Sequence, residues 1–214
     1  MKNKIIGIVS VVAFFVLLFY GQVIAIFPLF GIVYSVHTRI QLSMNHFYKK
    51  YIGLGLVFGL FTEVLAVLDN LDTAPEERIL FSPDPGMDLV LGVGFYFFIA
   101  LVWSILVKKY TFTFKSVFII GGIWGIVMEN DMAVLISPLT QGILIGLLSY
   151  AFVFLVYGPF MAIPPLFFKE SLNTQDRKER KLRHGILAFM LLFAAWGLAA
   201  LYMGVVYTAL GLSP

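Results

Sequence analysis

Long apolar runs separated by short charged segments form the dominant pattern of this chain. The runs cover roughly 5–35, 52–69, 88–107, 116–136, 142–168 and 185–210. Each is long enough to cross a bilayer as a helix, which takes about 20 residues. The pattern therefore predicts an all-α polytopic membrane protein, with six transmembrane helices in a single integral membrane domain over residues 1–214.

The first run allows more than one interpretation. Lys2 and Lys4 precede an apolar stretch, as in a signal peptide, but the apolar stretch continues to Val36 and part of it recurs later in the chain, which argues against removal. We expect one long helix. The alternative is a hairpin within 5–36, whose halves of about 14–16 residues are short for spans; it makes seven crossings and returns the N-terminus to the side of the next basic loop.

The charged segments alternate in sign along the chain. Segments 37–51, 108–115 and 169–184 hold twelve of the fifteen Lys and Arg residues, whereas segment 70–87 is acidic. Basic loops lie on the cytoplasmic side of membrane proteins. With six crossings, this rule places the three basic segments in the cytoplasm and both termini outside, and we expect the plasma membrane of a prokaryote.

Two internal similarities indicate duplication. Residues 15–30 align without a gap on 152–167 with ten identities, and residues 55–63, GLVFGLFTE, repeat the glycine, aromatic and glutamate positions of 121–129, GGIWGIVME. A degraded copy of the second pattern follows at 196–201. We infer three parallel two-helix repeats, over about 5–71, 88–136 and 142–210, related by an axis along the bilayer normal.

Glu63 and Glu129 are the strongest candidates for chemistry. Counted at 1.5 Å per residue, both lie roughly 20 Å from the cytoplasmic boundary of the bilayer. Gly59 and Gly125 lie one turn before them on the same helix faces, and small residues let helices approach closely. A carboxylate at this depth faces a cavity, finds a partner or takes up a proton. We expect a paired acidic site, either an acid/base couple or an ion site; the alternative is a pair of glutamates that only locks helix packing.

Weaker candidates surround this pair. Asp69, Asn70, Asn130 and Asp131 lie nearer the outer surface and are candidate substrate-binding residues, although Asp131 faces the other side of its helix from Glu129. The acidic segment 70–87 either concentrates cations or is a solvated loop. Asp84 and Pro85 have the pattern of an N-cap and first residue of a helix.

Composition narrows the function classes. The chain is 60% hydrophobic and 13% charged, with a mean hydropathy of +0.94. It has no cysteine, which excludes disulfide, thiolate-metal and cysteine-nucleophile chemistry. The net charge of +3 follows membrane topology and does not indicate nucleic-acid binding.

The sequence contains no Walker, His-Glu-x-x-His or Gly-x-Ser-x-Gly motif. No metal site or cofactor is indicated. Three functions stay open: a transporter or channel for a small cation or proton, a membrane-embedded enzyme acting on a lipid or isoprenoid by glutamate acid/base chemistry, and a scaffold subunit. The lipid bilayer is the expected partner in each.

Overall fold

The computed structural model describes residues 2–20, 22–130 and 132–211, and their regular structure is helical apart from one isolated bridge between Tyr110 and Lys178. Short 3-10 turns lie at Val23–Ala25, His37–Arg39 and Pro75–Glu77. The α-helices are α1 (Lys2–Phe19), α2 (Ile26–Val36), α3 (Phe47–Asp69), α4 (Pro85–Lys109), α5 (Phe114–Met128), α6 (Ala133–Thr140), α7 (Ile143–Phe167), α8 (Lys169–Asn173) and α9 (Leu182–Ala209).

Four of these helices, α3, α4, α7 and α9, are long and apolar enough to cross a membrane. A fifth span results if α5 and α6, which are bent by 68° at their junction, are counted together. The prediction of six transmembrane helices is therefore not confirmed. Two of the six apolar runs, 5–35 and 116–136, are each divided between two helices.

The first run is divided at Gln22, so the single long helix expected there is wrong. Gln22 has an extended backbone, with φ −76° and ψ 125°. Its side chain donates to Oδ1 of Asp69 at 3.0 Å, and the Val23 N–H donates to Oδ2 of the same carboxylate at 3.4 Å. A carboxylate at a helix start satisfies amide groups that have no partner within the helix. Asp69, 47 residues away, thus stabilises the break.

Helices α1 and α2 form the antiparallel hairpin of the alternative interpretation. Gly7 faces Ser35 and Gly31 faces Ser10, so each helix offers a glycine where its neighbour carries a serine. Both helices belong to the shorter apolar class, below the length of the four candidate spans. Because α2 runs antiparallel to α1, the end of α2 lies beside the start of α1.

The fourth run is divided after Met128. Glu129 leaves the helix with ψ 131°, and Asn130 and Met132 have positive φ values of 49° and 68°. Asparagine tolerates this left-handed region, but a long side chain such as methionine does so at an energetic cost. The sequence predicts Glu129 within a single helix. In the structure it lies instead at the break between α5 and α6.

The internal similarity of the sequence is not reproduced as three equal hairpins. Residues 15–30 extend over the break between α1 and α2, whereas the matching residues 152–167 lie within the continuous helix α7. Gln22 is extended and held by Asp69, but its counterpart Pro159 lies within a helix. Tertiary contacts therefore give two similar segments different structures.

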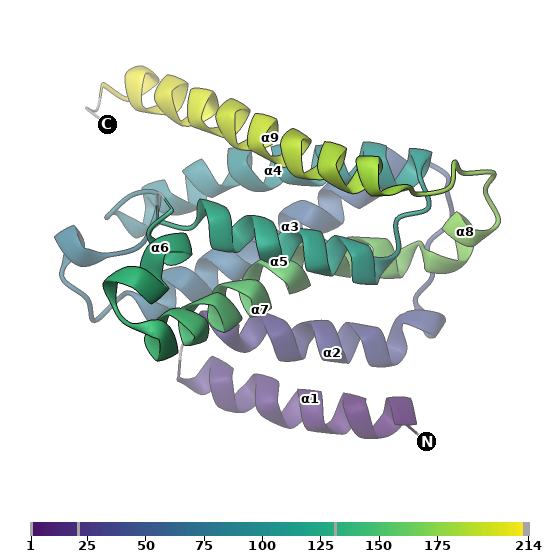
Figure 1. The fold of residues 1–214 in the computed structure, drawn as a ribbon, viewed down its shortest axis with the longest axis horizontal. Helices are drawn as coiled ribbons and strands as arrows, with labels where there is room; N and C mark the ends of the chain where they lie inside the picture. Colours follow the sequence, from purple (N-terminus) through teal and green to yellow (C-terminus); the bar gives the residue numbers. More distant parts are fainter. Residues whose placement is uncertain (1, 21, 131, 212–214) are drawn as a thin grey trace.

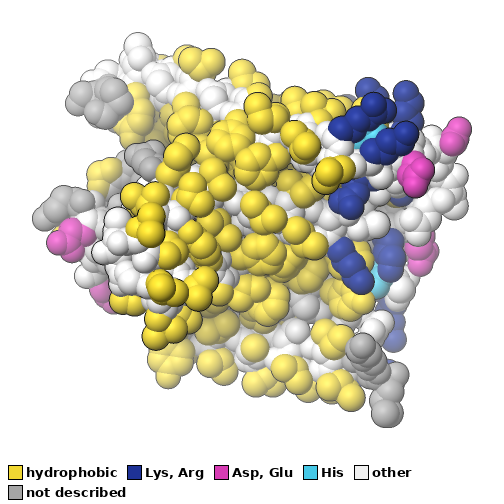
Figure 2. Space-filling model, in the orientation of Figure 1, with side chains coloured by type: hydrophobic (Ala, Val, Ile, Leu, Met, Phe, Trp, Pro, Cys, Tyr) yellow, Lys and Arg dark blue, Asp and Glu magenta, His cyan; other side chains and the backbone are white. Residues whose placement is uncertain are grey.

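The helices pack in a bundle with α1 and α2 along one side and α9 along the other (Figure 1). Between them, α3 packs on α4 and α5 on α7, while α9 covers α4 and α2 contacts α7. Side chains of Lys and Arg gather at one end, and hydrophobic side chains cover the middle (Figure 2). We call this end, with segments 37–51, 108–115 and 169–184, the basic end.

The start of α1 and the end of α9 lie at opposite ends of the bundle (Figure 1). The N-terminal end lies at the basic end because α1 and α2 form a hairpin. The expectation that both termini lie outside stays a prediction. Which end faces the cytoplasm stays a prediction from the charge pattern.

Helix α4 begins where the sequence predicts. The Asp84 side chain accepts a hydrogen bond from the Met87 N–H at 2.7 Å, and Pro85 is the first helical residue. This cap fixes the start of the helix that carries two further residues of the site described next.

Candidate functional site

Glu63 lies on α3 and is 5% exposed. The hydroxyl of Tyr96, on α4, donates to its Oε2 at 2.6 Å. Gly59 lies one turn before Glu63, and a side chain there would overlap the Tyr96 ring. The glycine thus gives the tyrosine the space it needs to reach the glutamate, as expected for a Gly-x-x-x-Glu helix face.

Glu129 repeats this arrangement with another pair of helices. The hydroxyl of Tyr157, on α7, donates to its Oε2 at 2.5 Å. Gly125 is buried against the ring of Tyr157, just as Gly59 is buried against Tyr96. Each glutamate found in the sequence therefore has a tyrosine donor from the helix that packs against its own.

Aromatic rings connect the two glutamate–tyrosine pairs. The ring of Phe160 lies 5.3 Å from that of Tyr96 and 5.6 Å from that of Tyr157, measured between centroids. Trp124 lies 5.9 Å from Tyr157 and is fully buried. The surface between the two carboxyl groups is therefore made largely of aromatic rings.

Both pairs line one partly open cavity of about 760 Å³. This volume lies within the range of sites that bind small molecules. Helices α3, α4, α5, α7 and α9 all contribute to its wall. Of the six residues predicted from sequence, five line it and Asp131 lies outside the described residues; the five are Glu63, Glu129, Asp69, Asn70 and Asn130.

The segment 71–84, which we call the strap, covers the end of the cavity opposite the basic end. Its residues 77–81 line the cavity. The Ile79 N–H donates to Oδ1 of Asn70 at 3.2 Å, and the Arg78 guanidinium donates to the carbonyls of Thr73 and Pro83 at 3.1 and 2.8 Å. Arg78 therefore holds the strap in a folded shape.

Asp69 and Asn70 have structural contacts as well as places in the cavity wall. Asp69 binds the break before α2, as described above, and Asn70 binds Ile79 of the strap. Their role as ligand-binding residues stays a prediction. Their hydrogen bonds show that they position the segments around the cavity.

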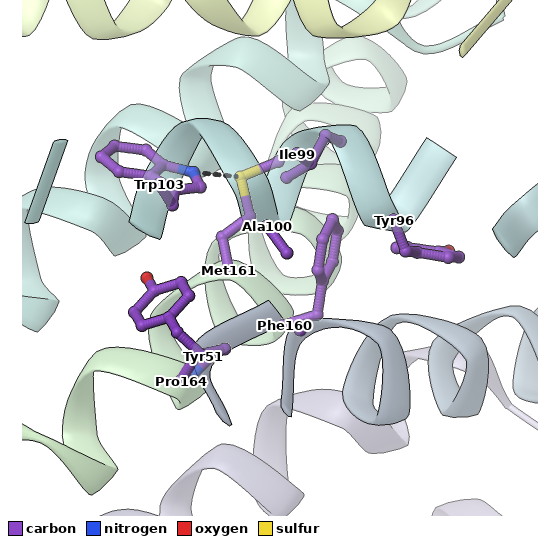
Figure 3. Close-up of a pocket in the computed structure, with 9 residues that line it drawn as sticks. Tyr51, Tyr96, Ile99, Ala100, Trp103, Phe160, Met161 and Pro164 are labelled. Carbon is purple, nitrogen blue, oxygen red and sulfur yellow. Dashed lines mark hydrogen bonds between the residues drawn. The ribbon is translucent and has the colours of Figure 1, made fainter. Parts of the chain in front are cut away.

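The cavity does not continue to the basic end. Between Tyr96 and the basic end, the side chains of Ile99, Trp103 and Met161 fill the bundle. The Trp103 indole donates to the Met161 sulfur at 3.3 Å (Figure 3). The space left there is about 10 Å³, around the volume of one water probe. The cavity thus lies between the strap at one end and this packed layer at the other.

Sequence reasoning missed three residues of the site: Tyr96, Tyr157 and Asp88. Tyr157 lies within the repeated segment 152–167, and Asp88 lies at the start of an apolar run, but neither position by itself indicated a site. One signal was present, because Asp88, Gly92 and Tyr96 are spaced by four residues and so share a helix face. That face packs on Glu63: a side chain at Gly92 would lie 3.4 Å from the Glu63 Cγ atom.

Among the described residues, no group of three or more His, Cys, Asp or Glu side chains has a geometry that could hold a metal ion. Comparison of the chain with protein-family models, curated proteins and solved structures finds no match. The inference of function therefore depends on the geometry of the cavity.

Proposed function

We propose that the protein is a membrane-embedded enzyme that binds a lipid or isoprenoid in the cavity and transfers protons with Glu63 and Glu129. The observation that carries this proposal is that two glutamate–tyrosine pairs face one cavity, with aromatic rings between them. Two carboxyl groups in one site can divide the roles of acid and base.

The chemistry needs no further reactant. A neutral carboxyl group gives its proton to a carbon–carbon double bond, whose π electrons form the new C–H bond and leave a carbocation. The rings of Phe160 and Trp124 stabilise the positive charge through their faces. The second glutamate, as carboxylate, removes a proton from a neighbouring carbon, and that C–H electron pair forms a new double bond. The net result is the shift of a double bond, an isomerisation.

The tyrosine hydroxyls hold the two carboxyl groups for this task. Each donates to Oε2 of its glutamate and so fixes the orientation of the carboxyl group at the cavity wall. A hydrogen bond to a carboxylate stabilises its charge, so the tyrosine supports whichever glutamate acts as base. Positioning of acid and base in a site shielded from water is the main contribution expected of the protein.

The side of the cavity between α7 and α9 supports entry from the bilayer. Phe152 of α7 and Trp196 of α9 both line the cavity, yet they are 38% and 40% exposed. Helix α5 ends at Met128, so it does not extend between α7 and α9 toward the strap. An apolar chain in the bilayer reaches the aromatic rings through this side, with a polar group near the strap.

Native mass spectrometry of the purified protein tests the first part of the proposal. We expect a retained amphiphile in the wild type and its loss in Ala200→Trp, because Ala200 lines the cavity. Leu201→Trp is the matched control, since Leu201 is exposed on the same helix. Absence of any bound amphiphile in the wild type, or equal retention by both variants, contradicts the proposal.

Deuterium exchange tests the chemistry even when the substrate is unidentified. Incubated in D₂O, the wild-type protein should place deuterium on carbon atoms of its bound amphiphile, which mass spectrometry of the extracted molecule detects. Glu63→Gln and Glu129→Gln should each abolish this exchange, because an amide neither gives nor takes the proton. A bound amphiphile that gains no deuterium at carbon would argue against an enzyme.

A proton-linked transporter is the second candidate, supported by the break between α5 and α6 at Glu129. Discontinuous helices commonly form ion sites in transporters. Transport requires a second conformation in which the packed layer around Trp103 and Met161 opens. Proton flux into proteoliposomes, lost in Glu129→Gln and present without deuterium exchange, would favour this function.

A further inference from the structure

Asp88 is a buried acid outside the acid/base pair. It lies on α4 and is 0% exposed. Its Oδ1 accepts hydrogen bonds from the backbone N–H groups of Phe81 and Ser82, at 2.7 and 3.3 Å. Both donors belong to the strap. Asp88 therefore fastens the strap to the helix bundle at the point where residues 77–81 cover the cavity.

The other oxygen of Asp88 faces a different environment. Oδ2 is buried and accepts no hydrogen bond from an amide, amine or hydroxyl group of the described residues. The Glu63 side chain packs on the same face of α4: a Cβ atom at Gly92, one turn after Asp88, would lie 3.4 Å from the Glu63 Cγ atom and 3.7 Å from its Oε2. Two carboxyl groups, 0% and 5% exposed, thus face each other from adjacent helices.

The surroundings of this pair provide no neutralising cation among the described residues. From α3 and α4 the neighbouring titratable groups are Asp69 and Tyr96; from the α5–α6 junction and α7 they are Glu129 and Tyr157. The strap contributes Glu77 and Arg78, and the Arg78 guanidinium hydrogen-bonds to backbone carbonyls. Helix α9 contributes Tyr207, whose hydroxyl donates to the Phe81 carbonyl at 3.5 Å. Two like charges in contact at low dielectric repel each other strongly. A proton between the two carboxyl groups converts that repulsion into a hydrogen bond.

We propose that Asp88 and Glu63 share one proton, and that this proton keeps the strap closed over the cavity. Asp88 is then a positioning residue: it links the state of Glu63 to access from the strap side. The inference concerns the site of the proposed function and in that respect rests on it. Its test uses no substrate, so failure of the enzyme proposal leaves the result interpretable.

The sign of the pH dependence follows from proton counting. The closed form holds the shared proton, whereas in the open form water solvates the two carboxylates and the proton is released. Because the closed form binds more protons, raising the pH favours the open form. For one proton the equilibrium changes by at most about tenfold per pH unit.

A single cysteine in the strap measures this opening, since the native chain has none. Leu80 lines the cavity and is only partly exposed, so in full-length Leu80→Cys the thiol should react with N-ethylmaleimide mainly when the strap opens. Thr174→Cys, in an exposed segment at the basic end, corrects for the pH dependence of the thiol itself. The corrected rate should rise several-fold with pH. A flat corrected rate would overturn the proposal.

Two substitutions in the Leu80→Cys background test whether the carboxyl groups of Asp88 and Glu63 cause the pH dependence. Asp88→Asn retains an oxygen for Phe81 and Ser82 and provides an N–H for Glu63, and Glu63→Gln provides an N–H for Asp88. Both should keep the strap closed and make the rate independent of pH. Asp72→Asn, which changes an exposed acid of the strap that does not line the cavity, should keep the wild-type slope. An unchanged slope in Asp88→Asn or Glu63→Gln, or its loss only in Asp72→Asn, would exclude the shared proton.

Discussion

Gly125 faces the ring of Tyr157 so closely that a methyl group does not fit between them. The same relationship joins Gly59 and Tyr96 on the other side of the cavity. In both places, the glycine lies one helical turn before a glutamate on its own helix. The space at the glycine lets a tyrosine of the neighbouring helix reach that glutamate. The two contacts make the packing of α3 on α4 and of α5 on α7 part of the candidate site.

Replacing either glycine with leucine should therefore destabilise the protein. Overpacking in a well-packed region typically costs about 1–3 kcal/mol. Gly59→Leu and Gly125→Leu should lower the thermal stability in detergent, and Gly53→Leu is the control on α3, since nothing lies within 4 Å of a side chain there. Equal stabilities for Gly53→Leu and Gly59→Leu would show that the close contact has no energetic importance.

Removing a tyrosine hydroxyl tests the hydrogen bonds to the two glutamates. Tyr96→Phe and Tyr157→Phe leave a buried carboxyl oxygen without its donor, which costs about 1–3 kcal/mol. We expect lower unfolding free energies and slower deuterium exchange into the bound amphiphile. Tyr202→Phe, which removes a hydroxyl bonded to the Val90 carbonyl in an exposed position, is the control. A larger loss in Tyr202→Phe would contradict the assignment.

Glutamine substitutions should separate function from folding. Glu63→Gln and Glu129→Gln keep the side-chain shape and an oxygen for the tyrosine hydroxyl, so each should abolish activity while the protein still folds. Circular dichroism and size-exclusion chromatography check the fold beside the activity measurement. Full activity in either variant would leave that glutamate with a packing role only.

A double-mutant cycle should distinguish the two acids near Glu63. Groups in contact give interaction energies of about 0.5–3 kcal/mol, whereas distant groups add independently. We expect coupling within this range between Glu63→Gln and Asp88→Asn. Glu63→Gln and Glu129→Gln should couple more weakly, because their carboxyl groups belong to separate tyrosine contacts. Chemical unfolding of the single and double variants measures both energies.

Membrane orientation can be tested with single cysteines in sealed cells. The positive-inside rule predicts a cytoplasmic basic end, so Thr174→Cys should resist an impermeant thiol reagent and Ala74→Cys, in the strap, should react. Because α1 and α2 form a hairpin, a cysteine at Asn3 should behave like one at Thr174. Labelling of Thr174→Cys from outside would reverse the orientation.

The sequence by itself determined the all-helical, apolar character of the chain and the approximate limits of its four longest helices, and it singled out the two glutamates that line the cavity. Apolar run length and charge alternation are local properties of the chain, so they predicted α3, α4, α7 and α9 within a few residues, and Asp84 and Pro85 indicated the start of α4. The glycines before Glu63 and Glu129 indicated helix faces in close contact, which the structure shows for Gly59 and Gly125.

Only the tertiary structure decided where the apolar runs break and which groups meet the glutamates. The break at Gln22 depends on Asp69, and nothing in residues 5–36 reveals a hydrogen bond to a carboxylate on another helix. Likewise, Tyr96 and Tyr157 reach the glutamates because of how the helices pack, and Asp88 receives the Phe81 N–H of the strap only in the folded chain. Hydropathy and spacing describe one segment at a time, whereas these contacts join segments far apart in the chain.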